Sequence, residues 1–286
     1  MVHIDYNVEG VMDIVLPSSS STKPWVIMIH GGGWHFQTKS AMEGLACVFA
    51  NRGYPVVNVS YPLLSFTFDQ VLLLLSVLTL LVILCWAWLR YDVQLLTGLW
   101  LMIMMIIGEI WRHKPWLTIE DQLSMILKQV EYIHTRYELS SDCPWIVAGY
   151  SSGAHLSSLI SMRGLPSGLG YIHTSVLISG IYGKDLFLEM PASYELYKAT
   201  FQDVKGEFAL EYSQPNDDRT CILLINGESD LNLKKHSYYF YHHLYDAGIY
   251  VKSIMIPDTT HWSVHREWSH SRSWVMDQVE EFIERL

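Results

Sequence analysis

The chain has 286 residues, of which 50% are hydrophobic and 17% charged, and its formal net charge is −10. This acidic balance argues against a nucleic-acid partner, which would require a basic face. The length suits one large domain or two small ones.

Residues 1–17 contain no basic segment followed by an apolar run, so we expect no signal peptide. Cys47, Cys85, Cys143 and Cys221 have no CxxC spacing, which indicates reduced, buried thiols.

Short segments rich in Val and Ile predict strands that are covered on both faces. They lie at 25–30, 54–61, 144–151, 175–180, 221–228 and 251–257. Amphipathic segments predict helices at 118–137, 236–247 and 273–286, and Thr118 with Asp121 resembles a capping box. This alternation predicts an α/β fold, a mostly parallel sheet with helices on both faces.

The sequence GYSSG, residues 149–153, lies between a predicted strand and a predicted helix. A G-x-S-x-G elbow in this context presents its middle residue above the sheet, where the helix N-terminus favours developing negative charge. We therefore predict that Ser151 is a nucleophile.

The sequence HGGGW, residues 30–34, directly follows another predicted strand. Consecutive glycines leave backbone N–H groups free to point into a cavity, and acyl transfer needs such donors for its tetrahedral oxyanion. Gly31 and Gly32, joined by the N–H of Ser152, are the candidate oxyanion hole.

A serine nucleophile needs a base and an orienting carboxylate, and after an elbow of this kind the acid precedes the histidine. Asp230 and His261 each follow a predicted strand, at the edge of the sheet where such sites assemble. Glu228 is an alternative acid. His155 and His30 lie near the motifs, but we expect His155 to point away from the nucleophile and His30 to brace the glycine loop.

Clustered histidines, such as His242 with His243, lack carboxylate or cysteine partners at ligand spacing, so no metal is expected. No cofactor is expected either.

The motifs HGGGW, VSYPL, GYSSGAHL, SGIY, NGESD and TTHW together resemble the α/β-hydrolase fold. Within it, the chain resembles the esterase group that includes isoprenylcysteine methylesterases, kynurenine formamidase-like enzymes and feruloyl/acetyl-xylan esterases. The resemblance implies the same nucleophile (Ser151), acid (Asp230), base (His261) and glycine pair as the residues themselves. It also implies a short cap after Gly180. Tyr182 and Phe187 from this segment, with Trp34, would either line a substrate pocket or pack in the core.

Residues 65–115 depart from that group's pattern, and the catalytic domain would therefore be discontinuous, comprising 1–64 and 116–286. Two uncharged or nearly uncharged runs, at about 71–89 and 93–111, are each long enough to span a hydrocarbon core of roughly 30 Å. Tryptophans near the turn and the exit suit interfacial belts. We expect a transmembrane hairpin; a monotopic hairpin and a soluble lid are the alternatives.

A hairpin returns the chain to the side that it left, so both halves of the catalytic domain would stay together. Arg112 and Lys114 against Arg90 in the turn favour a cytosolic catalytic domain, on an endomembrane such as the endoplasmic reticulum in a eukaryote. Gly98 or Gly108 leaves room for a homodimer.

The sequence thus predicts a membrane-anchored serine hydrolase that cleaves an amphiphilic or lipid-like carboxylic ester, with membrane lipid as its other partner. An amidase, a formamidase or an acyltransferase would use the same residues. A non-catalytic membrane adaptor on a hydrolase scaffold is the alternative from another class.

Overall fold

The structure is a computed structural model that describes residues 3–7, 11–64, 79, 117–190, 193–201, 205–266, 268 and 272–285. The predicted membrane hairpin at 65–115 lies outside these residues, apart from Thr79. Within the described part of the chain, no helix has both the length and the apolar composition that crossing a bilayer requires.

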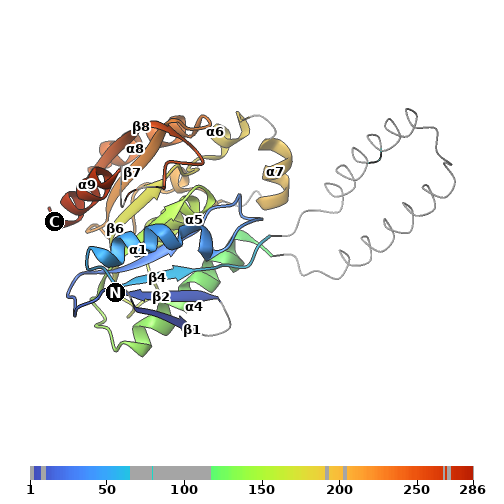
Figure 1. Ribbon diagram of the computed structural model, residues 1–286. Coiled ribbons are helices and arrows are strands. Elements are labelled where there is room, and N and C mark those ends of the chain that lie inside the picture. Colours follow the sequence, from blue (N-terminus) through green and yellow to red (C-terminus); the bar gives the residue numbers. More distant parts are fainter. Residues whose placement is uncertain are drawn as a thin grey trace, which may run out of the picture.

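Eight strands of the described chain form one sheet in the order β1-β2-β4-β3-β5-β6-β7-β8 (Figure 1). The first pairs, β1 with β2 and β2 with β4, are antiparallel, and every pair from β4 to β8 is parallel. The strands are β1 (His3–Asn7), β2 (Met12–Leu16), β3 (Trp25–Ile29), β4 (Val56–Val59), β5 (Pro144–Tyr150), β6 (Tyr171–Ile178), β7 (Cys221–Ser229) and β8 (Val251–Thr260). The predicted α/β class with a mostly parallel sheet is confirmed.

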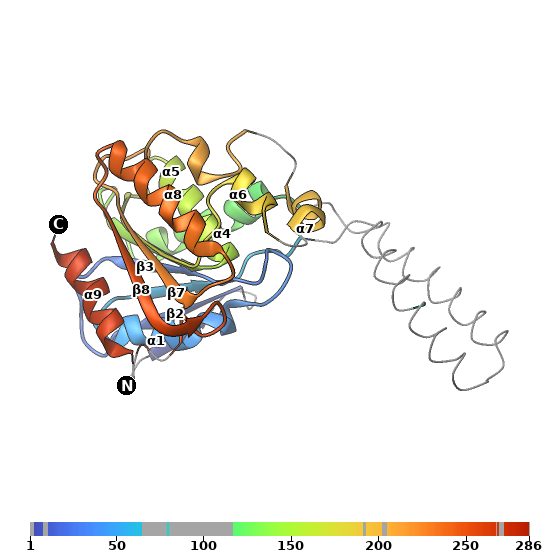
Figure 2. The same ribbon diagram turned by 90° about the horizontal axis from the view of Figure 1, so that it is seen from above.

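Helices cover both faces of this sheet, as Figures 1 and 2 show. On one face lie α1 (Glu43–Asn51) and α9 (Ser273–Glu284), whose buried residues pack in one core cluster with Val26 and Val56. On the other lie α4 (Ile119–Arg136), α5 (Ser152–Arg163) and α8 (Leu233–Asp246). The core therefore consists of two apolar layers, one on each side of the sheet.

The capping box predicted for α4 is confirmed. The backbone N–H of Asp121 donates to the Thr118 hydroxyl, and the backbone N–H of Thr118 donates to the Asp121 carboxylate. The strands β1 and β2 and the helix α1 were not predicted. Because β2 has only five residues and one of them, Asp13, is charged, it carries a weak sequence signal.

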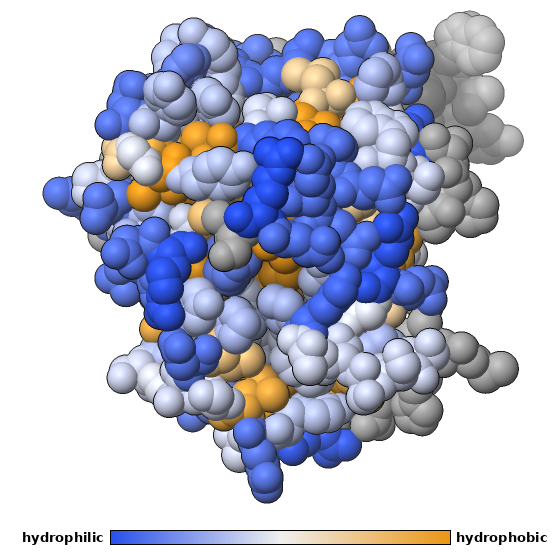
Figure 3. Space-filling view, turned by 90° about the vertical axis from the view of Figure 1, so that its left-hand side faces the viewer, coloured by the Kyte–Doolittle hydropathy of each residue, from blue (hydrophilic) through white to orange (hydrophobic). Residues whose placement is uncertain are grey.

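Between β6 and β7 the chain forms α6 (Lys184–Leu188), α7 (Ser193–Thr200) and the 3-10 turn η2 (Ala209–Glu211). A second 3-10 turn, η1 (Lys39–Met42), precedes α1. In Figure 1, α7 lies beside the carboxyl ends of the parallel strands, near the point where the described chain stops at 64. Figure 3 views the opposite side, where these strands start, and its surface is largely hydrophilic.

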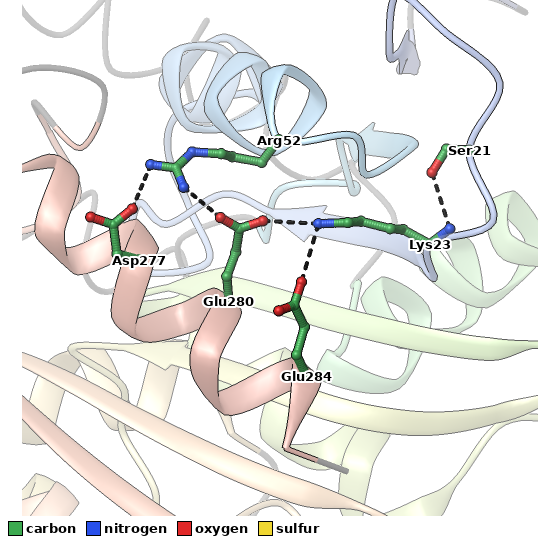
Figure 4. A network of polar contacts seen from close by, with 6 residues as sticks. All are labelled: Ser21, Lys23, Arg52, Asp277, Glu280 and Glu284. Carbon is green, nitrogen blue, oxygen red and sulfur yellow. Dashed lines mark hydrogen bonds and ion pairs between the residues drawn. The ribbon is translucent and has the colours of Figure 1, made fainter.

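A network of ion pairs, drawn in Figure 4, connects helix α9 to the residue that follows α1, Arg52, and to the segment before β3, at Lys23. Glu280 lies at its centre, with its carboxylate 2.9 Å from Lys23 Nζ and 2.5 Å from Arg52 Nη1. Asp277 and Glu284 add outer contacts to the same two cations. The Glu280 side chain is only 15% exposed, so its charge is better shielded from water than that of a surface pair.

We expect Glu280→Gln to lower the free energy of unfolding by about 1–2 kcal/mol, because it leaves two cations without their shared anion. The control is Glu281→Gln, which removes an exposed pair with Arg285 and should cost no more than about 0.5 kcal/mol. Urea denaturation of both variants measures the difference. Equal losses would contradict a special role for Glu280.

Candidate active site

The predicted elbow lies where β5 ends and α5 begins. Ser151 has a φ of 55° and a ψ of −119°, a strained conformation that the sharp turn imposes. A methyl group on Gly149 would lie 2.3 Å from the carbonyl oxygen of Gly153, and one on Gly153 would lie 2.3 Å from that of Ile29. The two glycines therefore allow the close approach of strand and helix that the turn needs.

Three side chains from three strand ends form one hydrogen-bonded chain. Ser151 Oγ lies 3.1 Å from His261 Nε2, and His261 Nδ1 lies 2.8 Å from Asp230 Oδ1. Asp230 directly follows β7 and His261 directly follows β8, and both side chains are almost fully buried. The structure thus brings together the predicted nucleophile, base and acid, and their catalytic roles stay a prediction.

The carboxylate of Asp230 is held by two further donors that the sequence reasoning missed. Ser179 Oγ donates to Oδ2 over 2.5 Å and Asn226 Nδ2 donates to the same oxygen over 2.9 Å. Burial acts to raise the pKa of Asp230, but the hydrogen bonds from His261, Ser179 and Asn226 outweigh it, and the pKa lies below its ordinary value. The group is therefore an anion at neutral pH, and Ser179 and Asn226 hold the oxygen that does not bond to the imidazole.

The alternative acid, Glu228, does not contact His261. Its side chain accepts a hydrogen bond from the backbone N–H of Asp258 over 3.0 Å, and the residue is exposed. Among the two candidates, the structure places only Asp230 against the imidazole.

The glycine loop lies against the elbow. A methyl group on Gly31 would meet Ser151 Cβ at 3.1 Å, and one on Gly32 would lie 2.1 Å from the carbonyl oxygen of Phe36. Gly32 also has a φ of +110°, which side chains rarely adopt. Within the described chain, nothing accepts a hydrogen bond from the amides of Gly31, Gly32 or Ser152. These N–H groups are therefore available to a ligand oxygen.

Tyr61 contacts this loop through its hydroxyl and its ring, and sequence reasoning did not single it out. Its hydroxyl donates to the carbonyl of His30 over 3.0 Å, and its ring stacks on the His30 imidazole with centroids 4.2 Å apart. His30 in turn donates from Nδ1 to the Gly31 carbonyl over 2.7 Å. The expectation that His30 braces the loop agrees with these contacts.

The side chain of His155 makes no hydrogen bond to Ser151 or His261 and bonds to other residues. Its Nδ1 accepts from Trp34 Nε1 over 3.2 Å, and its Nε2 donates to the Glu207 carbonyl over 2.7 Å. Burial lowers the pKa of His155 to about 4, so the ring is neutral and structural.

Trp34, Tyr182 and Phe187, the candidate substrate-binding residues, are each at most 1% exposed. Trp34 packs edge-on against Phe187 with centroids 5.8 Å apart, and Tyr182 stacks on Phe240 at 4.6 Å. In the structure the three side chains thus pack in the core, which is one of the two roles expected for them, and substrate binding by any of them stays a prediction. Each is a large aromatic that fills space between the sheet and its helices.

The two described ends that flank the predicted insert meet beside the glycine loop. The backbone N–H of Leu64 donates to the Trp34 carbonyl over 3.0 Å. After the gap, Gln122 Nε2 donates to the same carbonyl over 3.1 Å and to that of Pro62 over 2.8 Å. His35 Nδ1 also donates to the Leu64 carbonyl over 3.0 Å. The chain thus leaves and returns at the carboxyl edge of the sheet, next to the triad.

The described residues contain no group of three or more metal-ligating side chains.

Comparisons with known proteins agree with this geometry. A family model described as BD-FAE matches residues 12–68, which include the glycine loop. Among curated proteins, no sequence matches this chain.

Among solved structures, native esterase 2 of Thermogutta terrifontis is similar with a TM-score of 0.62 and 12% identity, over 99% of this chain and 91% of that one. The same esterase phosphonylated by sarin gives a TM-score of 0.64 and 11% identity over 99% and 94%. Its propionate-bound form gives 0.62 and 12% over 100% and 93%. At this identity the likeness shows the fold, and the chain has an α/β-hydrolase fold.

Proposed function

We propose that the protein is a serine hydrolase of carboxylic esters. The observation that carries this proposal is the unbroken hydrogen-bonded chain from Ser151 through His261 to the buried anion of Asp230. A binding protein has no use for this arrangement beside a loop of unoccupied amides. The Thermogutta terrifontis esterase is phosphonylated by sarin and binds propionate, which supports carrying ester chemistry to this site.

In the proposed reaction, His261 Nε2 takes the proton of Ser151 as the hydroxyl oxygen attacks the ester carbonyl carbon. The negative charge on the former carbonyl oxygen is stabilised by the amides of Gly31, Gly32 and Ser152. His261 then protonates the departing alcohol, which leaves an acyl group on Ser151. Water, deprotonated by the same imidazole, attacks the acyl carbon and releases the acid.

Asp230 keeps His261 in the tautomer that this sequence of steps requires. Because Asp230 Oδ1 accepts the proton on Nδ1, Nε2 is left as an acceptor facing Ser151. The anion also stabilises the imidazolium formed in each half-reaction.

We also propose that residues 65–115 anchor this site to a membrane, so that an amphiphilic ester enters it from the bilayer, with the catalytic domain on the cytosolic side. Two observations support the placement. Leu64 and Gln122, on either side of the insert, both bond to the backbone of the glycine loop. In addition, Phe36, Leu231 and Trp262 come from three loops at this edge and are 58%, 53% and 60% exposed. Such large apolar side chains suit the interfacial region of a bilayer.

Deleting residues 65–115 and joining the ends with a short Gly-Ser linker tests the anchor. The linker has little distance to cover, because Gln122 already bonds to Pro62. We expect the shortened chain to keep its turnover of a short, water-soluble ester but to hydrolyse long-chain esters in vesicles at least about tenfold more slowly, since membrane attachment raises the local substrate concentration.

The short ester is the control that the shortened protein has folded. Equal rates on vesicle-bound esters, before and after deletion, would show that the insert does not deliver substrate.

A further inference from the structure

A cavity of about 420 Å³ lies beside the triad, on the face of the sheet that α1 covers. Its wall comes from four segments: the end of the glycine loop with η1, helix α1, the last residue of β5, and the loop after β8. The lining residues are Gln37, Ser40, Ala41, Gly44, Leu45, Val48, Tyr150, Trp262, His265, Arg266 and Trp268. None of the residues that we place in the reaction steps forms this wall.

The cavity is nevertheless joined to the reaction site through shared neighbours. Tyr150 precedes the nucleophile in the chain, and its hydroxyl donates to the carbonyl of His261 over 2.7 Å. The Tyr150 ring also lies against the His265 ring, with centroids 4.1 Å apart. Trp262 follows the base, and its ring centroid lies 5.2 Å from that of His261. A ligand in the cavity would therefore touch side chains that flank both Ser151 and His261.

The charge of this cavity is opposite to that of the whole protein. The chain carries a formal net charge of −10, yet no Asp or Glu contributes to the lining. Arg266 brings a guanidinium, and within the described chain no carboxylate pairs with it. The neighbouring anion, Asp230, is already engaged by three donors. An unpaired Arg in an acid-free hollow favours a ligand with a negatively charged oxygen.

A second polar group in the wall also lacks a partner. The Nδ1 atom of His265 is buried and makes no hydrogen bond. Burial, with the nearby charges of Arg266 and His261, lowers the pKa of His265 to about 4, so the ring is neutral at physiological pH. A neutral imidazole with a protonated Nδ1 would donate to an oxyanion, and this bond would remove the cost of its unsatisfied burial.

Apart from Gln37 and Ser40, the rest of the lining is mainly apolar and would suit a carbon chain rather than a bare ion. Leu45 and Val48 from α1 contribute aliphatic side chains to the lining, and Trp262 and Trp268 contribute two indole rings. Burying such a chain adds roughly 0.8 kcal/mol for each methylene group removed from water. The cavity thus combines an apolar wall with one cation at its rim.

We propose that this cavity is a subsite for the anionic end of the substrate, an amphiphilic ester that carries a carboxylate or phosphate on an apolar chain. This inference rests on the proposed esterase function and deepens it, because it names the substrate class. Arg266 pairs with the oxyanion, His265 donates to it, and the apolar wall holds the chain that leads to Ser151.

The test measures binding to the full-length, detergent-solubilised protein that carries Ser151→Ala, so that it does not depend on turnover. Butyl phosphate and inorganic phosphate are titrated separately by calorimetry. We expect butyl phosphate to bind at least about tenfold more tightly than inorganic phosphate, because the butyl group is buried against the apolar wall. Adding Arg266→Gln should weaken butyl phosphate at least about tenfold, the usual effect of losing a charged hydrogen bond.

Arg136→Gln is the matched control, since Arg136 is exposed at the end of α4 and this variant removes the same charge far from the cavity. Its affinity for butyl phosphate should equal that of the parent. Equal binding by the Arg266 and Arg136 variants would overturn the proposal, as would equal affinity for the two phosphates or no binding of either.

A kinetic arm uses the active protein with an ester that carries a carboxylate on a short apolar chain as substrate. Butyl phosphate should inhibit its hydrolysis competitively, whereas purely non-competitive inhibition would overturn the assignment as a subsite. A protein that binds butyl phosphate through Arg266 but hydrolyses no ester would refute the proposed function and leave the anion site standing. An active esterase in which Arg266→Gln has no effect on butyl phosphate would do the reverse.

Discussion

Replacing Ser151 with alanine is expected to lower ester turnover by about 10⁴-fold or more, because loss of the nucleophile leaves only binding and oxyanion stabilisation. The alanine variant should also fail to form an adduct with a fluorophosphonate probe, which the parent forms at this oxygen. Mass spectrometry of the labelled protein and initial rates with a soluble ester measure the two effects.

Ser158→Ala is the matched control, because Ser158 lies on the same helix, α5, and its hydroxyl bonds to the backbone carbonyl of His155. It should be labelled and should turn over ester as the parent does. If the folded parent takes no label at all, the non-catalytic adaptor becomes the better reading. If the Ser151 variant is labelled and active, another residue is the nucleophile.

Replacing Asp230 with asparagine is expected to lower kcat by about 10⁴-fold while leaving KM within a few-fold. The amide of asparagine can donate to His261 Nδ1, and the imidazole would then carry its proton on Nε2. That tautomer cannot accept the proton of Ser151, which now lies 3.1 Å from Nε2. Steady-state kinetics of the purified variant measure kcat and KM separately.

The rival acid supplies the control for this variant. Glu228→Gln removes a carboxylate only two residues away, but that side chain is exposed and bonds to the Asp258 backbone. Its kcat should stay within a few-fold of the parent. A larger loss for Glu228→Gln than for Asp230→Asn would assign the acid to Glu228 and refute the present reading.

The structure also explains why a substitution at Asp230 acts through the imidazole and not through loss of folding alone. Ser179 and Asn226 donate to Oδ2, while His261 donates to Oδ1. An asparagine whose oxygen replaces Oδ2 keeps the bonds from Ser179 and Asn226, and its amide nitrogen then faces His261. Ser179 itself sits in a left-handed conformation with a φ of 52°, directly after β6. This turn at the end of β6 places the Ser179 hydroxyl where it can donate to Asp230.

Local patterns in the sequence were sufficient to predict much of this molecule. Buried strands appear as short runs of Val and Ile, and the start of α4 appears as Thr118 with Asp121, because both depend on neighbours in the chain. The elbow around Ser151 and the glycines at 31 and 32 are likewise local, since a strand, a tight turn and a helix follow one another directly.

Sequence patterns do not determine which of two neighbouring carboxylates is the acid of the site, because this depends on how the segments pack. Glu228 and Asp230 are two residues apart at the end of β7, so strand alternation gives both the same direction and cannot rank them. The hydrogen bonds from His261, from Ser179 after β6 and from Asn226 in β7 all go to Asp230. None of these contacts is visible as a sequence pattern.

The sequence by itself thus determined the fold class, the elbow and the glycine loop, each a consequence of residues adjacent in the chain. Only the tertiary structure decided which acid meets the imidazole, that Trp34, Tyr182 and Phe187 are core residues, and that Arg266 faces an acid-free hollow. The physical reason is the same for all three. Burial and hydrogen-bond partners come from segments far apart in sequence, and their positions are set by how the sheet and helices pack.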